Sequence, residues 1–123
     1  MARYGVAVIG ADGWLNLPHI RFTTNNCGEH FYHQAFRFEE MFERLVLPLR
    51  DRRSIDLEMD FTEETADVYR RHRYNYRDID VILLEGIFLF QPRFRHHFDL
   101  RCWIDCSFET ALARALHRCQ EGL

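Results

Sequence analysis

The segment Asp80–Gly86 constrains the fold most, because four large apolar residues in a row lead directly into an acid and a glycine. A half-exposed strand would alternate apolar and polar residues. The unbroken run instead predicts a strand buried on both faces, as in a parallel sheet covered by helices. Glu85 would then lie at the carboxyl end of this strand, where open α/β sheets bind their ligands.

Tyr4–Ile9 has the same apolar character and predicts a second buried strand. It ends at the turn Gly10–Gly13, which again leaves an acid, Asp12, directly after a strand. If both strands belong to one parallel sheet, Asp12 and Glu85 lie at the same edge of that sheet.

The middle of the chain predicts a helix followed by a hairpin. Residues 14–36 look irregular. Apolar residues at helical spacing then predict an amphipathic helix through Phe38, Met41, Phe42, Leu45 and Leu49. Arg37 belongs to the polar residues around this stripe, and Pro48 is expected to kink or end the helix. Alternation in 54–61 predicts a half-exposed strand, with 68–76 returning beside it.

The end of the chain predicts a short helix within 88–98, a strand at 100–104 and a final helix. Ser107 is expected to cap that helix. Its buried face would consist of Ala111, Leu112, Ala115, Leu116 and Cys119. The order of elements favours α/β, with a mainly parallel sheet flanked by helices and an inserted β-hairpin. A length of 123 residues predicts a single domain, 1–123.

All 16 basic residues are arginine and the net charge is -3. This balance argues against a general nucleic-acid or membrane-surface binder. No apolar run reaches the ~18 residues of a membrane span, and no signal-peptide cleavage site follows the first apolar run. We therefore expect a cytoplasmic protein with small-molecule partners, no nucleic acid and no membrane, and self-association stays open.

The four cysteines are Cys27, Cys102, Cys106 and Cys119, and none forms a Cys-x-x-Cys pair. Buried free thiols are the expected state of such residues in a reducing compartment. Cys102 and Cys106 lie near histidines, but their spacing fits no zinc pattern.

The acids Asp12 and Glu85 form the first candidate site. Two carboxylates at one sheet edge suit metal-assisted phosphoryl transfer. One can take the proton of an acceptor hydroxyl or orient it, while the other holds Mg²⁺ directly or through water. Either acid alone is more simply a turn residue or a helix cap, so it is the pair that indicates function.

Two further groups have two interpretations each. One face of the last helix carries Arg114, His117 and Arg118, which either clamp phosphate oxygens or are simply solvated. The hairpin carries Phe61, Tyr69, His72, Tyr74 and Tyr76. These rings either stack on a nucleobase or line an acceptor pocket, or they form cross-strand core pairs.

The turn Val8–Gly13 has a superficial likeness to a dinucleotide-binding turn and to the Asp-Gly motif of flavin hydroxylases. The chain has no Gly-x-Gly-x-x-Gly, and no helical pattern opens after Gly13, so a flavin or dinucleotide domain is the weakest alternative. Without lysine there is no Gly-x-x-x-x-Gly-Lys-Ser/Thr phosphate loop, and no Gly-x-Ser-x-Gly elbow is present either.

Four segments in order resemble the uridine kinase/phosphoribulokinase-like family of P-loop kinases. Asp12–Pro18 is similar to the family's segment after its second strand, and Asp60–Phe61 to the start of its substrate hairpin. Val81–Phe88 resembles the Walker-B-like strand with its Glu-Gly pair. Trp103–Asp105 followed by Glu109–Arg118 resembles the strand and arginine-bearing helix that lead into the ATP lid.

The resemblance implies ATP-dependent phosphorylation of a hydroxyl on a nucleoside or similar small acceptor, with ATP and Mg²⁺ as cofactors. It implies Asp12 as the general base, and Glu85 and Gly86 as cofactor-binding residues with Glu85 on the Mg²⁺. Arg114 and Arg118 would be catalytic and stabilise charge on the transferred group. The substrate-binding residues that it implies are Trp14, Phe61, Tyr69, His72 and Tyr74.

The chain also departs from the family pattern. The phosphate-binding loop would precede Asp12 by one strand and one helix, and Met1–Gly10 is too short to contain it. Met59 and Glu64 stand where nucleoside kinases carry tyrosine and histidine around the hairpin turn. We therefore expect a kinase domain truncated or degenerate at both ends. The alternative is a catalytically inactive module that still binds a nucleotide or nucleoside.

Overall fold

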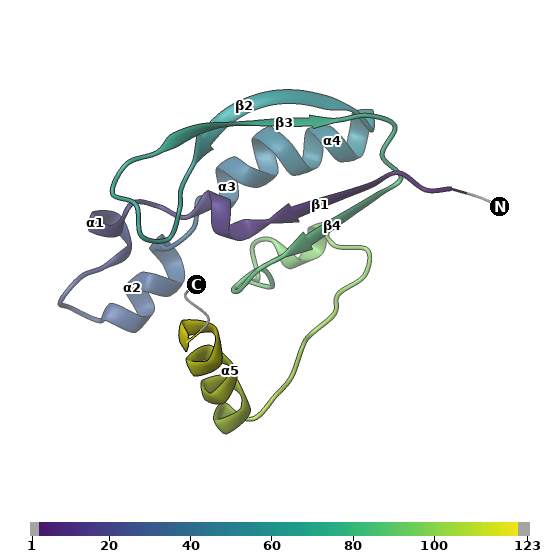
Figure 1. Ribbon diagram of the computed structural model, residues 1–123. Helices are drawn as coiled ribbons and strands as arrows, with labels where there is room; N and C mark the ends of the chain where they lie inside the picture. Colours follow the sequence, from purple (N-terminus) through teal and green to yellow (C-terminus); the bar gives the residue numbers. More distant parts are fainter. Residues whose placement is uncertain (1–2, 121–123) are drawn as a thin grey trace. The chain divides into compact units, whose positions relative to one another are not determined.

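The computed structural model describes residues 3–120 (Figure 1). The chain divides into two compact units, Met1–Gln91 and Pro92–Leu123, and the prediction of a single domain stays a prediction. Across residues 3–120, no helix is both long enough and apolar enough to cross a membrane.

The first unit is built on a parallel pair of strands, β1 (Val6–Gly10) and β4 (Val81–Glu85). The register pairs Val6 with Val81 at one end and Gly10 with Glu85 at the other. The predicted parallel pairing is therefore confirmed, and both strands end where the sequence places its two acids.

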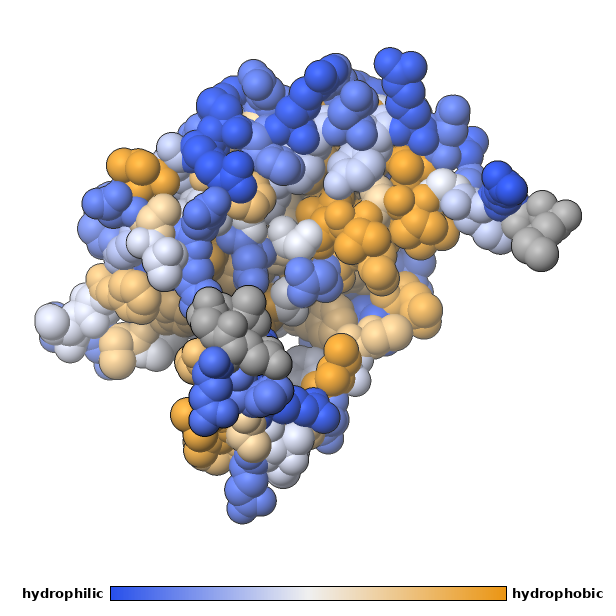
Figure 2. Space-filling model, viewed as in Figure 1, coloured by the Kyte–Doolittle hydropathy of each residue, from blue (hydrophilic) through white to orange (hydrophobic). Residues whose placement is uncertain are grey.

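One face of this pair is covered within the first unit. Ala7 and Ile9 of β1 are buried, whereas Val8 of β1 and Leu83 of β4 are 57% and 54% exposed. Figure 2 shows hydrophobic surface over these two strands. The prediction of burial on both faces is therefore wrong for this unit. An unbroken apolar run makes a strand suitable for covering on two sides, but it does not determine how many sides are covered.

Asp80 ties the start of β4 to the start of β1 and to the end of a helix. Its carboxylate accepts a hydrogen bond from the Gly5 N–H (2.9 Å) and pairs with the Arg53 guanidinium, whose Nε donates to the Ile79 carbonyl (3.0 Å). Arg53 is left-handed (φ 63°) and its N–H donates to the Leu49 carbonyl (2.8 Å), which caps that helix. These contacts hold the parallel register at the end opposite the two acids.

The helix that ends there runs beside the hairpin (Figure 1) and consists of α3 (Phe38–Met41), a π-helical turn η2 (Phe42–Val46) and α4 (Leu47–Arg52). Its buried side chains are Phe38, Met41, Phe42, Leu45, Val46 and Leu49, which confirms the predicted apolar stripe. Pro48 does not end the helix, which continues to Arg52, and a kink at Pro48 stays a prediction. A proline ring clashes with the carbonyl four residues earlier in a regular α-helix, and the wider turn before Pro48 relieves this clash.

The predicted hairpin is confirmed: β2 (Ile55–Phe61) pairs antiparallel with β3 (Arg70–Tyr76). Its exposed side carries two ion pairs, Asp56–Arg73 and Asp60–Arg71, which we call the hairpin ion pairs. Arg70 lies opposite Phe61 on the other side and pairs with Glu63. The hydrogen bonds from Arg73 hold the pKa of the Asp56 carboxyl below its usual value.

Residues 14–36 are more regular than the sequence indicates. The turn η1 (Ala11–Trp14) is followed by two helices, α1 (Pro18–Arg21) and α2 (Cys27–Gln34). The prediction of an irregular segment is therefore wrong. Pro18 opens α1, as prolines commonly do at the first turn of a helix. No residue of α2 is buried, and its eight residues are too few for a helical apolar period to stand out in the sequence.

The second unit contains η3 (Arg95–His97) and α5 (Phe108–Gln120). The Ser107 hydroxyl accepts a hydrogen bond from the Thr110 N–H (3.1 Å), which confirms the predicted cap. The helix expected within 88–98 is only η3, and the described structure has no strand at 100–104, where Trp103 is 78% exposed. A strand requires a neighbour to pair its backbone groups, and this segment has none there.

Two burial predictions also prove wrong. No residue of α5 is buried in the described structure, so its apolar face is not covered within the second unit. All four cysteines are exposed free thiols. Apolar spacing shows which residues share a face, but not whether that face is covered.

We predict that Leu45→Ala lowers the free energy of unfolding by about 2–5 kcal/mol, because it empties a fully buried position. The matched change Leu83→Ala should lower it by less than about 1 kcal/mol, because Leu83 is half exposed. Chemical denaturation followed by circular dichroism measures both values. Equal losses would contradict the exposed outer face of β4.

Candidate active site

The parallel register brings Glu85 to the turn that carries Asp12. Glu85 pairs with Gly10, two residues before Asp12 in the sequence. A Cβ atom on Gly10 would lie 2.8 Å from the Glu85 Oε1 atom, so the carboxylate occupies the space that the missing side chain leaves. Asp12 and Glu85 are both exposed. The two acids thus lie at one edge of the parallel pair, as the sequence predicts.

Gly86 has a steric role next to this carboxylate. Its φ of 154° is rarely adopted by residues with a side chain, and a Cβ atom there would lie 2.6 Å from the Ala11 Cβ. The Glu85–Gly86 pair therefore packs closely on Gly10–Ala11, which directly precedes Asp12. Whether Gly86 also contacts a cofactor stays a prediction.

Asp12 is the exposed member of a turn that is otherwise buried. In η1, the residues Ala11, Gly13 and Trp14 are buried while the Asp12 side chain faces solvent. A short 3-10 turn after a strand is thus anchored on both sides of the acid. The Asp12 carboxylate is therefore exposed to solvent while the backbone on both sides of it is held by buried residues.

Four of the five predicted substrate-binding residues form a continuous row of rings beside this turn. Ring centroids are 4.8 Å apart for Phe61 and His72, 4.6 Å for His72 and Tyr74, and 5.9 Å for Tyr74 and Trp14. The Phe61 ring lies directly over Gly13, where a Cβ atom would be 2.3 Å from it.

Burial divides these predicted residues into two groups. Trp14 and Tyr74 are 0% and 5% exposed, and burial raises the pKa of the Tyr74 hydroxyl. Phe61, Tyr69 and His72 are half-buried. Only the second group offers aromatic surface to a ligand, whereas the first group supports it from the core.

The predicted catalytic arginines belong to the second compact unit. Arg114 and Arg118 lie on α5, and both side chains are exposed. Their role stays a prediction from the sequence.

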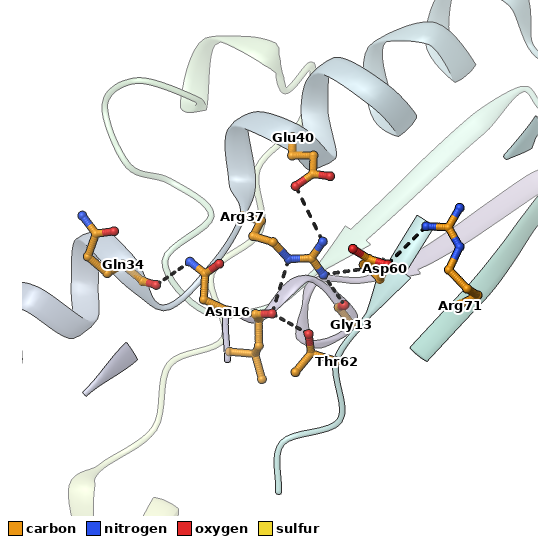
Figure 3. A network of polar contacts seen from close by, with 9 residues as sticks. Gly13, Asn16, Gln34, Arg37, Glu40, Asp60, Thr62 and Arg71 are labelled. Atoms are coloured by element: carbon orange, nitrogen blue, oxygen red, sulfur yellow. Dashed lines mark hydrogen bonds and ion pairs between the residues drawn. The ribbon is translucent and has the colours of Figure 1, made fainter. Parts of the chain in front are cut away.

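Two polar residues with little exposure, Arg37 and Thr62, contact the Gly13–Leu15 segment and have no counterpart in the sequence prediction (Figure 3). The sequence places Arg37 on the polar face of a helix, but it precedes α3 and its side chain is only 10% exposed. Thr62 is 1% exposed, and its hydroxyl donates to the Leu15 carbonyl (2.6 Å). Arg37 stands between Phe36 and Phe38, both buried in the structure, but nothing in the sequence marks the groups that its side chain binds.

The acidic edge fits a hard divalent cation. Carboxylate oxygens are suitable Mg²⁺ ligands, and Asp12 and Glu85 supply them at one edge. No group of three His, Cys, Asp or Glu residues within 3–120 could hold a metal ion. A Mg²⁺ held by one or two carboxylates together with water and substrate phosphates is the usual arrangement.

The fold and this edge define the class of protein. A parallel pair with acids at its carboxyl edge, flanking helices and an inserted hairpin is an α/β arrangement with the P-loop kinase fold. A solved structure described as a possible uridine kinase from Bacillus stearothermophilus matches with a TM-score of 0.72 and 25% sequence identity. The match covers 85% of this chain and 56% of that chain.

The sequence match specifies the family. The model of the phosphoribulokinase/uridine kinase family matches residues 12–121, so the chain belongs to this family. No curated protein matches the sequence significantly. The family assignment made from Asp12–Pro18 and Val81–Phe88 is confirmed.

We predict that Gly86→Ala lowers the free energy of unfolding by about 1–3 kcal/mol, because its methyl group meets Ala11 at an unfavourable φ. Gly10→Ala should lower it by less than about 1 kcal/mol, since the flexible end of Glu85 can turn away. Urea denaturation of both variants measures the difference. A larger loss for Gly10→Ala would contradict the described packing.

Proposed function

We propose that this chain carries the acceptor edge of a uridine kinase-like phosphotransferase, which transfers phosphate from ATP to a hydroxyl of a nucleoside or similar small acceptor. The observation that carries this proposal is the pairing of Gly10 with Glu85, which leaves two exposed carboxylates at one sheet edge. Family membership over residues 12–121 supports it. The partners that we expect are ATP and the acceptor, in the cytoplasm.

Asp12 would act as the general base. It would accept the proton of the acceptor hydroxyl as the oxygen of that hydroxyl attacks the terminal phosphorus of ATP. Glu85 is the side chain proposed to hold Mg²⁺, which when bound neutralises charge on phosphate oxygens. The close packing of Glu85–Gly86 on Gly10–Ala11 supports a fixed relation between the two acids.

The half-buried rings suit a flat acceptor. Phe61, Tyr69 and His72 each leave part of their aromatic surface exposed next to the Asp12 turn, and aromatic surface binds nucleobases by stacking. The Arg70 guanidinium lies 4.5 Å from the Phe61 ring centroid, so a ligand on that face would have to displace it. Arg114 and Arg118 are proposed to stabilise negative charge on the transferred phosphoryl group.

A catalytically inactive module that binds a nucleotide or nucleoside is the second candidate. The observation that favours it is the absence of lysine from the whole sequence, since the phosphate loop of this fold uses a lysine.

We predict that Asp12→Asn lowers turnover at least about a hundredfold, because a positioned base contributes about that much, while ATP–Mg²⁺ binding is retained. Asp51→Asn, an exposed acid at the end of α4, is the matched control and should behave as the wild type. Phosphorylation of a nucleoside panel measures turnover and calorimetry measures binding.

Unchanged turnover of Asp12→Asn would reject Asp12 as the base. If the wild type binds ATP–Mg²⁺ or a nucleoside without phosphorylating any acceptor, the inactive module is correct. Absence of both binding and turnover would reject both candidates.

A further inference from the structure

Arg37 connects the two segments that frame the Asp12 turn (Figure 3). Its Nε donates to the Leu15 carbonyl (3.4 Å) and its Nη2 to the Gly13 carbonyl (3.2 Å), both on the turn. The same Nη2 donates to the Asp60 carbonyl on β2 (2.8 Å). One guanidinium group thus joins the segment after β1 to the substrate hairpin.

The guanidinium group is enclosed by rings as well as by carbonyls. Its central carbon lies 5.0 Å from the Trp14 ring centroid and 4.8 Å from that of Tyr69. The Glu40 Oε2 atom lies 3.6 Å from the Arg37 Nη1 atom, and the Arg37 side chain is only 10% exposed. Three hydrogen bonds, an ion pair and two ring faces together offset the cost of burying the charge.

The backbone around Arg37 holds the same turn. The Arg37 N–H donates to the Trp14 carbonyl (2.7 Å), and Leu15 forms an antiparallel bridge with Phe36. The Asn16 side chain donates to the Gln34 carbonyl (2.7 Å). The turn is therefore fixed from one side by these backbone contacts. Its link to the hairpin is shared by the Arg37 side chain and Thr62, whose N–H donates to the Gly13 carbonyl (3.0 Å) and whose hydroxyl donates to the Leu15 carbonyl (2.6 Å).

Only arginine fits this position. Three acceptors from two segments need a planar group with several donors in a fixed fork, and the two rings need a flat cation. Lysine carries a compact ammonium that can satisfy fewer of these contacts. Nε and Nη2 already serve protein carbonyls, so Arg37 is poorly suited to bind a substrate phosphate.

We propose that Arg37 is a positioning residue: it locks the Asp12 turn to the hairpin and so sets the Asp12 carboxylate relative to an acceptor held by Phe61, Tyr69 and His72. The catalytic part of this inference rests on the proposed function. Gly13 follows Asp12 directly, and its carbonyl accepts from both Arg37 and the Thr62 N–H, so loss of Arg37 removes one of the two hydrogen bonds that hold the residue next to the acid. A displacement of about 1 Å in a reacting group can lower a rate about a hundredfold.

The test compares Arg37→Lys and Arg37→Gln with Arg73→Gln. Arg73 is a matched control because it is an arginine on the hairpin that Arg37 contacts, it pairs with Asp56, and its side chain is 61% exposed. Arg37→Lys retains the positive charge, so it can still be measured if Arg37→Gln does not fold. Turnover is measured per folded molecule, together with acceptor KM and amide hydrogen exchange along the chain.

Both Arg37 variants are expected to lower kcat about 10- to 100-fold with acceptor KM nearly unchanged. Amide exchange of residues 11–16 should rise about tenfold or more, without a matching rise elsewhere. Arg73→Gln should match the wild type in all three measurements. Unchanged kcat, or exchange that rises evenly along the chain, overturns the proposal, because a purely stabilising residue would give no local effect.

Failure of the proposed function gives a different result. If the wild type phosphorylates no acceptor, the kinase assignment fails, and hydrogen exchange alone decides the role of Arg37. A rise confined to residues 11–16 in both Arg37 variants then supports the positioning role. Exchange at 11–16 equal to that of Arg73→Gln overturns it.

Discussion

The backbone ladder between β1 and β4 is the interaction on which the arrangement of the first unit depends. A parallel ladder has one register in which each side chain faces the correct side, and a slip of one residue would turn Glu85 away from Gly10. Asp80 secures the beginning of the ladder through Gly5 and Arg53. The acid at the far end is therefore placed by contacts made at the near end, along a stiff pair of strands.

The sequence predicts those parts of the structure that depend on local patterns. The apolar run before Glu85 indicates the parallel strand, the alternation in 54–61 indicates the hairpin, and Ser107 indicates a helix start. Each of these signals lies within the segment that it describes. The acidic edge follows from two such signals together with the geometry of parallel strands.

The remaining parts depend on contacts between distant segments. The partners of Arg37 are backbone carbonyls of Gly13, Leu15 and Asp60, and every residue has such a carbonyl, so the sequence carries no mark of the acceptors. The burial of Trp14 and Tyr74, as opposed to the partial exposure of Phe61, is likewise decided by packing. Aromatic residues predict that a ring is present, but not which face of it remains free.

The chain uses one basic residue type for two unlike tasks. Arg37 is enclosed and joins segments, whereas Arg73 is exposed and pairs with a carboxylate in water, where such pairs contribute only about 0–1 kcal/mol. The different roles of Arg37 and Arg73 therefore follow from their surroundings and not from their residue type, which is the same.

The hairpin ion pairs also affect how copies of this chain meet. The exposed side of β2 carries Asp56, Glu58 and Asp60, and that of β3 carries Arg71 and Arg73. Two β2 edges from different molecules would bring carboxylate against carboxylate, and two β3 edges guanidinium against guanidinium, which disfavours the pairing of like strands. The segregation of charge by strand thus discourages edge-to-edge aggregation of like strands.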